Sequence, residues 1–255
     1  MKRIMDFKIV ENRHIHDLYS LMILRPASGE ILPEILPGQF VQVSVDQSKT
    51  TFLRRPISVN YVDCVANELW LLVRKAGDGT KALAKLEPGN TVNLILPLGN
   101  GFTVPDKDGR YLLVGGGVGV APLLQLGKVM KEAGIKPEFL LGARSERDLL
   151  EIENFRAIGT VHLSTDDGSV GVKGVVTVHP VMDNHFSMIY CCGPAPMMKA
   201  VAAKAASTGS ECEVSLENMM ACGLGACLCC VEKTVKGNVC VCTEGPVFNT
   251  KQLTW

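Results

Sequence analysis

The sequence has 255 residues, of which 47% are hydrophobic, and its 26 Lys and Arg residues balance its 26 Asp and Glu residues. This length is typical of two or three domains with a large buried core. Zero net charge argues against a nucleic-acid binder, which needs a basic surface. Asp6, Lys8 and Glu11 occupy positions where a secretory signal would be apolar, and the longest uncharged run, 111–127, contains five glycines. We therefore expect a cytoplasmic protein without a membrane span.

The N-terminal part, residues 1–103, predicts an antiparallel β-barrel. Short apolar runs with alternating pattern, such as 40–45 and 91–96, are separated by turn signals at Pro37-Gly38 and Pro88-Gly89. Strands of this length, divided by such turns, are typical of an all-β domain.

Two further segments follow. Residues 104–208 alternate apolar strands with helices, beginning with a strand at 111–117 and a helix at 121–134. This alternation predicts a doubly wound parallel α/β domain. Residues 209–255 are rich in Cys and Gly and show little helical pattern, so we expect a small C-terminal module that a metal group holds together.

The cysteines are the most specific feature. Six of the ten lie within 21 residues: Cys222, Cys227, Cys229, Cys230, Cys240 and Cys242. A chain without an export signal favours thiolate ligation over disulfides. C-x4-C-x2-C followed by a distant Cys is the plant-type spacing of a 2Fe-2S cluster. A structural zinc is the alternative, although zinc sites favour two short C-x2-C pairs and the segment has one.

The spacing predicts four of these cysteines as ligands of the cluster. They are Cys222, Cys227, Cys230 and Cys242. Cys229 would break the x2 spacing, whereas Cys240 shares a strand face with Cys242 and is the main alternative for the fourth ligand.

A glycine-rich turn from Gly115 to Pro122 follows the first strand of the α/β part. Glycines there let backbone N–H groups approach a pyrophosphate at a helix N-terminus. Close packing of strand and helix selects glycine as well, and the turn does not contain G-x-G-x-x-G. Cys192-Gly193-Pro194 ends a later strand, where open α/β sheets place ligands, whereas we interpret Cys191 as a core residue.

Two candidate sites lie in the barrel half. Arg55 and Ser58 stand three residues apart on an extended segment with Pro56, so they could contact a phosphate and a ring edge. Gly79-Thr80 precedes an apolar helix and offers backbone donors and a hydroxyl. A solvated Arg at a strand end and an ordinary capped turn are the alternatives.

Taken in order, Arg55 to Ser58, Gly79-Thr80, the 115–122 turn and Cys192 to Pro194 resemble the ferredoxin-NADP reductase superfamily. The tail, SLENMMACGLGAC at 215–227 and CTEGPVF at 242–248, looks like that of class B dihydroorotate dehydrogenase electron-transfer subunits. The resemblance covers essentially the whole chain. The sequence departs from the superfamily in that a cluster module replaces the C-terminal aromatic that often covers the flavin. Cys242 also comes much sooner than in plant-type ferredoxins, a short spacing that the class B subunits share.

The resemblance implies a role for each matched residue. Arg55 would bind the phosphate of FAD, Ser58 would approach flavin N5, and Ser58 and Cys192 are the candidate catalytic residues. The other implied FAD contacts are Pro56, Ile57, Leu72, Val73, Arg74, Gly79 and Thr80. The implied nicotinamide-nucleotide contacts are Gly115, Gly116, Gly117, Gly119, Cys192, Gly193 and Pro194.

The resemblance also implies a function in pyrimidine biosynthesis. Electrons would pass between NAD(H) and the FMN of a separate dihydroorotate-oxidising subunit by way of FAD and the 2Fe-2S cluster. The expected assembly is a heterotetramer with two copies of each subunit. The alternatives are an NADH-dependent reductase that feeds an oxygenase or a ferredoxin, and a zinc-stapled regulatory module without catalytic activity.

Two finer expectations concern the choice of nucleotide and of partner. Asp166-Asp167 follows a strand of the α/β part, and carboxylates near the adenosine ribose would favour NADH over NADPH. The pair could instead cap a turn, and Arg144 could serve a phosphate. Met219-Met220 and Leu224 are expected at the docking surface for the partner, unless the methionines pack inward.

Overall fold

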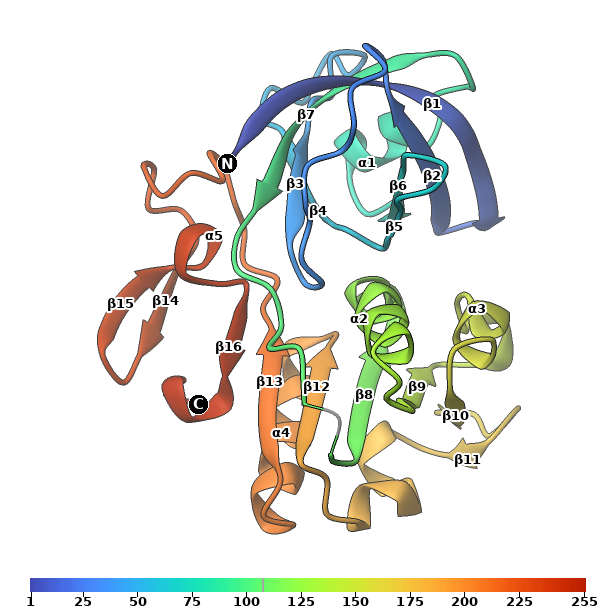
Figure 1. Cartoon of the computed structure of the whole chain (residues 1–255), viewed down its shortest axis with the longest axis vertical. Helices are drawn as coiled ribbons and strands as arrows, with labels where there is room; N and C mark the ends of the chain where they lie inside the picture. The colour runs from blue at the N-terminus through green and yellow to red at the C-terminus, as the bar shows by residue number, and fades with distance from the viewer. Residues whose placement is uncertain (107) are drawn as a thin grey trace.

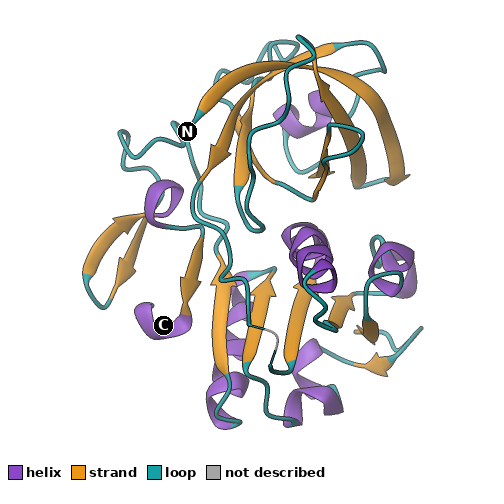
Figure 2. Ribbon diagram, in the orientation of Figure 1, coloured by secondary structure: helices purple, strands orange, loops and turns teal. Residues whose placement is uncertain are grey.

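The computed structural model describes residues 1–106 and 108–255, and its N-terminal part is a curled antiparallel sheet of seven strands (Figures 1 and 2). Its order is β4-β3-β7-β1-β2-β6-β5. Apolar side chains on alternate positions, Phe7 and Ile9 among them, fill its inner face. The elements are β1 (Arg3–His16), β2 (Tyr19–Pro26), β3 (Phe40–Val43), β4 (Arg55–Ser58), β5 (Tyr61–Asp63), β6 (Glu68–Arg74), α1 (Asp78–Leu83) and β7 (Thr91–Leu98).

A second sheet has the order β11-β10-β9-β8-β12-β13-β16, and all its pairs are parallel except β13 with β16. The chain moves outward from β8 to β11 and then returns to β12 on the other side of β8, so the sheet has a topological switch point there. The elements of its first half are β8 (Tyr111–Gly116), α2 (Ala121–Glu132), β9 (Glu138–Ala143), α3 (Ile152–Arg156), β10 (Thr160–Thr165) and β11 (Val172–Lys173). Those of the second are β12 (Met188–Cys192), α4 (Ala195–Ser207), β13 (Glu211–Ser215) and β16 (Val247–Asn249). Short 3-10 turns are η1 (Gly117–Val120), η2 (Glu146–Asp148), η3 (Val176–Val178), η4 (Pro180–Asp183) and η5 (Thr250–Gln252).

The Cys-rich segment leaves this sheet after β13 and returns to it as β16 (Figure 1). Between them lie the cysteine loop, the hairpin of β14 (Val231–Thr234) and β15 (Gly237–Cys240), and α5 (Val241–Glu244). β13 and β16 lie within the segment 209–255, which we expected to form a separate cluster module. They pair with the nucleotide sheet instead, because their apolar side chains, Val214 and Phe248 among them, complete its core. The division at 103 and 208 stays a proposal.

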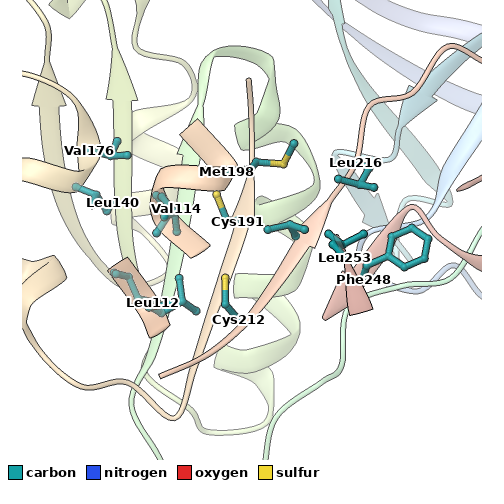
Figure 3. Packing of buried hydrophobic residues seen from close by; sticks show 14 of the residues in the cluster. Leu112, Val114, Leu140, Val176, Cys191, Met198, Cys212, Leu216, Phe248 and Leu253 are labelled. Atoms are coloured by element: carbon teal, nitrogen blue, oxygen red, sulfur yellow. The ribbon is translucent and has the colours of Figure 1, made fainter. Parts of the chain in front are cut away.

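Shared cores join the three parts. Figure 3 shows Val114 and Cys191 of the sheet beside Leu216, Phe248 and Leu253 of the C-terminal part. Cys230 and Cys242 belong to the same core. A second core packs the barrel side chains Tyr19, Leu21 and Leu72 against α2 and Tyr190.

The passage from barrel to sheet is fixed by polar contacts. Tyr190 donates a hydrogen bond to the Thr103 carbonyl at 2.8 Å. The Thr103 N–H and hydroxyl donate to the buried Glu213 carboxylate at 3.0 and 2.6 Å. The Phe102 ring meets Tyr190 edge-on at 5.6 Å. Within the described residues, no helix is long and apolar enough to span a bilayer.

Candidate functional site

The first cavity lies at the edge of the curled sheet, has a volume of about 520 Å³ and is bounded by the 50–55 loop and the start of α1. Arg55, Gly79 and Thr80 line it together. A Cβ at Gly79 would lie 3.0 Å from Thr51 Cγ2 and 3.3 Å from Arg55 Cδ, so the two segments lie in close contact here and a larger residue would require these side chains to shift. The expected FAD-phosphate residues are thus neighbours in space.

The polar groups of this cavity are partly engaged with the chain itself. The Arg55 guanidinium donates to the Leu53 carbonyl at 3.1 and 3.2 Å. The Thr80 hydroxyl accepts from the N–H groups of Ala76 and Gly77 at 3.0 and 3.1 Å. Thr80 therefore caps its own turn, which was the alternative interpretation, while its backbone still borders the cavity.

The expected flavin strand is β4, which pairs with β3 so that Pro56 lies opposite Gln42 and Ser58 opposite Phe40. Pro56, Ile57 and Ser58 are half-buried. Leu72 and Val73 of β6 are buried in the cores. Any FAD contact of these last two residues therefore comes from their backbone, as expected.

A second cavity of about 560 Å³ opens between the two sheets, at the switch point of the parallel one. Barrel residues, both glycine turns and the start of the Cys-rich segment contribute to it together. Its lining includes Tyr19, Arg74, Gly116, Gly117, Gly119, Arg144, Asp166, Gly193, Pro194 and Glu217. Arg74, expected at FAD, thus faces this cavity.

The glycines of the first turn are required by close contacts. A Cβ at Gly119 would come within 2.4 Å of the Cys192 carbonyl oxygen, and one at Gly116 within 2.5 Å of Met197 Sδ. Gly117 has a φ of +56°, a conformation that favours glycine. Gly115 does not belong to the described lining of the cavity, and a Cβ there would meet Val120 at 2.9 Å. Tight packing therefore accounts for Gly115, while Gly116, Gly117 and Gly119 also line the cavity and their contact with a nucleotide stays a prediction.

Cys192 lies beneath the floor of the cavity. It is 1% exposed, and burial raises the pKa of its thiol well above the usual range. Among the described residues that line the cavity is its neighbour Gly193, but not Cys192 itself. The catalytic role expected for Cys192 stays a prediction, and it would require a neutral thiol. Cys191 is a core residue, as we interpreted it.

Several lining residues were not predicted from the sequence or were expected elsewhere, among them Tyr19, Arg74 and Glu217. The Glu217 carboxyl is open to the cavity yet surrounded by protein, and this desolvation raises its pKa, with Arg74 acting in the opposite direction. The only signal in the sequence is that Glu217 is the single charged residue in 214–222.

The two carboxylates expected near the ribose point to different places. Asp166 lines the cavity together with Arg144. Asp167 instead accepts hydrogen bonds from the Ser169 N–H at 2.9 Å and from its hydroxyl at 2.7 Å, and these bonds lower the pKa of Asp167. Asp167 therefore caps a turn, and only Asp166 remains a candidate for contact with the ribose.

The cysteine loop brings the four expected ligands together in two hydrogen-bonded pairs, Cys222 with Cys227 and Cys230 with Cys242. In the described residues no three potential ligands form a ready-made metal site. Two thiol pairs suit the two irons of a 2Fe-2S cluster, so the donor set fits.

Backbone N–H groups of the loop point at these sulfurs. Leu224 N–H donates to Cys222 Sγ at 3.3 Å, and Gly225 N–H donates to Cys242 Sγ at 3.2 Å. The Leu224 N–H, followed by the neighbouring Cys227, lowers the pKa of Cys222 to about 6. Burial, followed by the Cys230 thiol, raises the pKa of Cys242 to about 12, so a metal must displace that proton.

Cys240 has a different environment. Its thiol points at the Gly225 carbonyl oxygen at 3.9 Å, whereas the sulfurs of Cys222 and Cys242 accept N–H donors, which stabilise a thiolate. Cys240 also hydrogen-bonds to Cys230 and thus competes with Cys242 for the same neighbour. Cys229 is exposed. The geometry therefore favours Cys242 as the fourth ligand.

Comparisons with known proteins cover both the sheet and the loop. Residues 113–203 match the oxidoreductase NAD-binding domain, and residues 217–254 match the iron-sulfur cluster binding domain of dihydroorotate dehydrogenase B. The electron transfer subunit of dihydroorotate dehydrogenase B (NAD(+)) from Lysinibacillus sphaericus is 43% identical over 86% of this chain and 88% of its own length. The subunit of that name from Fusobacterium nucleatum is 38% identical over 96% of both chains.

The chain belongs to the family of dihydroorotate dehydrogenase B electron transfer subunits. Among solved structures, an NADH-dependent reduced ferredoxin-NADP oxidoreductase matches with a TM-score of 0.86 and 30% identity over 98% of this chain and 90% of that chain. The FAD/NAD-binding domain of a Vibrio cholerae nitric oxide dioxygenase shares the fold, with a TM-score of 0.71 and 20% identity over 82% and 98%. The expected fold and the expected set of FAD, 2Fe-2S cluster and NAD(H) are confirmed.

We expect NADH to be preferred over NADPH, because the Asp166 carboxylate repels a 2′-phosphate. Asp166→Asn should reduce the ratio of kcat/KM for NADH to that for NADPH by about tenfold, the size of one charge contact. Asp167→Asn is the matched control and should leave the ratio unchanged. Steady-state assays with both nucleotides measure this, and a wild-type kcat/KM for NADPH equal to or above that for NADH would contradict it.

We expect Cys222, Cys227, Cys230 and Cys242 to be indispensable for the cluster. Replacing each of these by Ser should abolish the visible iron-sulfur absorption and reduce bound iron and sulfide, whereas Cys229→Ser and Cys240→Ser should retain the cluster. Loss of the cluster in Cys240→Ser with retention in Cys242→Ser would show that Cys240 is the fourth ligand.

We expect Glu217→Gln to lower kcat/KM for NADH by about tenfold, because hydride donation leaves a positive nicotinamide ring that a nearby carboxylate stabilises. The pKa of Glu217 is raised. As pH falls, its carboxylate is therefore protonated at a higher pH than that of an ordinary Glu. The wild-type rate should therefore decline on the acid side, and the variant should lack this limb. Exposed Glu146→Gln is the control, and an identical pH profile in wild type and E217Q would refute the role.

Proposed function

We propose that this chain transfers electrons between NAD(H) and the FMN of a dihydroorotate-oxidising catalytic subunit by way of FAD and a 2Fe-2S cluster. The observation that supports this most is the full-length similarity to electron transfer subunits, together with two cavities and a four-thiol loop in one rigidly packed chain. The cytoplasmic location and an assembly of two copies of each subunit are parts of the proposal.

Each part of the chain has a defined task. Arg55 and the Gly79 backbone hold the FAD phosphates at the first cavity, and β4 supports the flavin. The glycine turns and Gly193 hold the nicotinamide nucleotide, with Glu217 near its reactive end. Because the cavity lies between the sheets, residues of both sheets would contact the bound nucleotide.

The choice of cofactors follows from their chemistry. When bound, FAD exchanges a hydride with a nicotinamide and single electrons with an iron-sulfur cluster. The residues of this chain contribute binding, orientation and the local dielectric. Buried Cys230 and Cys242 hold one side of the cluster in the core, whereas exposed Cys227 holds the other side near the surface.

The surface around the cysteine loop supports docking of a partner. Met219 is 83% exposed, Leu228 64% and Leu224 47%, and apolar side chains gathered in this way mark an interaction surface. Met220, in contrast, packs against the shared core. The expected docking residues therefore divide, with Met219 and Leu224 facing outward and Met220 facing inward.

The alternatives have weaker support. The ferredoxin reductase in carbazole 1,9a-dioxygenase shares the fold at 19% identity. A likeness of fold alone gives no information about the partner of the present chain. A zinc-stapled module without catalysis would not require a nucleotide cavity lined by Arg74, Asp166 and Glu217. Electron transfer to a dihydroorotate-oxidising subunit accounts for both the cavity and the loop.

We expect the isolated chain to oxidise NADH with an artificial acceptor and to form no orotate from dihydroorotate, because its recognised sites include no second flavin site with a base for the substrate. Co-expression with a dihydroorotate-oxidising subunit should restore NAD-dependent orotate formation. Met219→Glu should reduce this coupled rate by about tenfold or more through a buried charge at the interface. Its oxidation of NADH with the artificial acceptor should remain unchanged.

Val65→Glu, at a side chain that is 99% exposed on the turn between β5 and β6, is the control and should leave both rates unchanged. Orotate formation by the isolated chain would refute the division of labour. Failure of the two chains to co-purify would favour the reductase that feeds an oxygenase.

A further inference from the structure

Gln42 is a polar side chain enclosed between the flavin strand and the cysteine loop. It lies in β3, opposite Pro56 of β4 on one side and Ile95 of β7 on the other. Its exposed fraction is 0%, and within the described residues neither Nε2 nor Oε1 has a hydrogen-bond partner. Native proteins rarely leave a buried amide unpaired, because desolvation is then not compensated.

The main chain at Gln42 is, by contrast, well satisfied. Arg54 donates hydrogen bonds to the carbonyl oxygens of Gln42 at 3.2 Å and of Asn93 at 2.9 Å. Only the carboxamide of Gln42 lacks partners. Because both of its polar atoms are unpaired, either orientation of the amide leaves a donor free.

The carboxamide lies directly against the cysteine loop. A Cβ at Gly223 would come within 2.8 Å of Gln42 Cγ and 2.9 Å of Nε2. Gly223 also has a φ of +69° and follows Cys222, whose sulfur accepts the Leu224 N–H. Glycine at position 223 thus lets the amide of Gln42 approach the backbone of a cluster ligand.

We propose that the Gln42 amide donates a hydrogen bond to a sulfur on the Cys222 side of the 2Fe-2S cluster, and so raises the reduction potential of the cluster. The inference rests on the proposed function, since it requires the cluster in this loop. A hydrogen bond to sulfur stabilises the more negative, reduced form, and such bonds are among the factors that set cluster potentials. Gln42 adds a side-chain donor to the backbone donors of Leu224 and Gly225.

The position of Gln42 indicates what a hydrogen bond from its amide to the cluster would do. Because Gln42 is opposite Pro56 in β3 and touches Gly223 in the loop, it stands between the supports of the two redox centres. A donor there favours electron transfer from the flavin to the cluster by making the cluster a better acceptor. The residue is predicted to act on the equilibrium of this internal step and not on binding of the nucleotide.

The test compares Gln42→Met with wild type in the full-length chain loaded with FAD and cluster. Met has nearly the same length and volume but no N–H donor. Redox titration followed by electron paramagnetic resonance and visible absorption should show the reduction equilibrium of the cluster shifted about tenfold toward the oxidised form, as for loss of one hydrogen bond to a charged group. The flavin potential and KM for NADH should remain unchanged.

Gln125→Met is the matched control, because Gln125 is also buried and has one unpaired amide oxygen, but donates to Ile35 at the contact between α2 and the barrel. Gln125→Met should lower the free energy of unfolding about as much as Gln42→Met does, and it should leave the reduction potential of the cluster unchanged. An unchanged reduction potential of the cluster in Gln42→Met, or a change confined to the potential of the flavin, would overturn the proposal.

A second measurement applies if Gln42→Met does not retain the cluster. Wild-type chain with 15N in the glutamine side chains should show a 15N hyperfine coupling to the reduced cluster, and the lack of any coupling would overturn the proposal. Wild-type chain that carries no FAD or no iron and sulfide would instead refute the proposed function itself. The two failures are thus distinguishable.

Discussion

The structure depends on a single apolar core that the parallel sheet shares with the Cys-rich segment. Cys230 and Cys242 are buried in it together with Leu216 and Phe248, so half of the cluster site is anchored by hydrophobic burial before any metal is considered. Because β13 and β16 are strands of the nucleotide sheet, the loop between them is held at both ends. Electron transfer needs fixed distances between centres, and this core supplies them.

Close backbone approach is the second constraint, and glycines make it possible at each junction. Gly79 brings α1 against Arg55, Gly119 brings the first turn against Cys192, and Gly223 brings the cysteine loop against Gln42. At Gly119 a Cβ would come within 2.4 Å of the backbone carbonyl oxygen of Cys192, whereas at Gly79 and Gly223 the neighbours are side chains that would have to shift.

Much of this arrangement could be predicted from the sequence, because periodicity and spacing are local signals. The change from alternating strands to strands and helices predicted the two sheets, and C-x4-C-x2-C predicted a thiolate site. The sequence could not assign β13 and β16 to the nucleotide sheet, since pairing over long range depends on tertiary burial. Nor could it separate Asp166 from Asp167, because only the fold shows that Ser169 engages the second carboxylate.

Residues that act across domains were the least visible. Gln42 has no motif around it, and Glu217 lies in the 215–227 motif without any signal that it faces a cavity. The significance of the two residues comes from missing hydrogen-bond partners and from a cavity wall. Cys240 and Cys242 show the same limit: alternation predicted one strand face for both, whereas β15 ends at Cys240 and Cys242 lies in α5. What distinguishes them is which backbone group each sulfur meets, the Gly225 carbonyl or the Gly225 N–H.

The cysteine site is asymmetric, and this asymmetry gives electron flow two different ends. On the inner side, the buried Cys242 thiol lies within protein, where a low dielectric strengthens each hydrogen bond to sulfur. On the outer side, exposed Cys227 lies near Met219 and Leu224 in sequence, both with apolar side chains open to a partner. Docking of a partner would cover that side and lower its dielectric as well. The potential of the cluster is therefore expected to respond to assembly from the outer side.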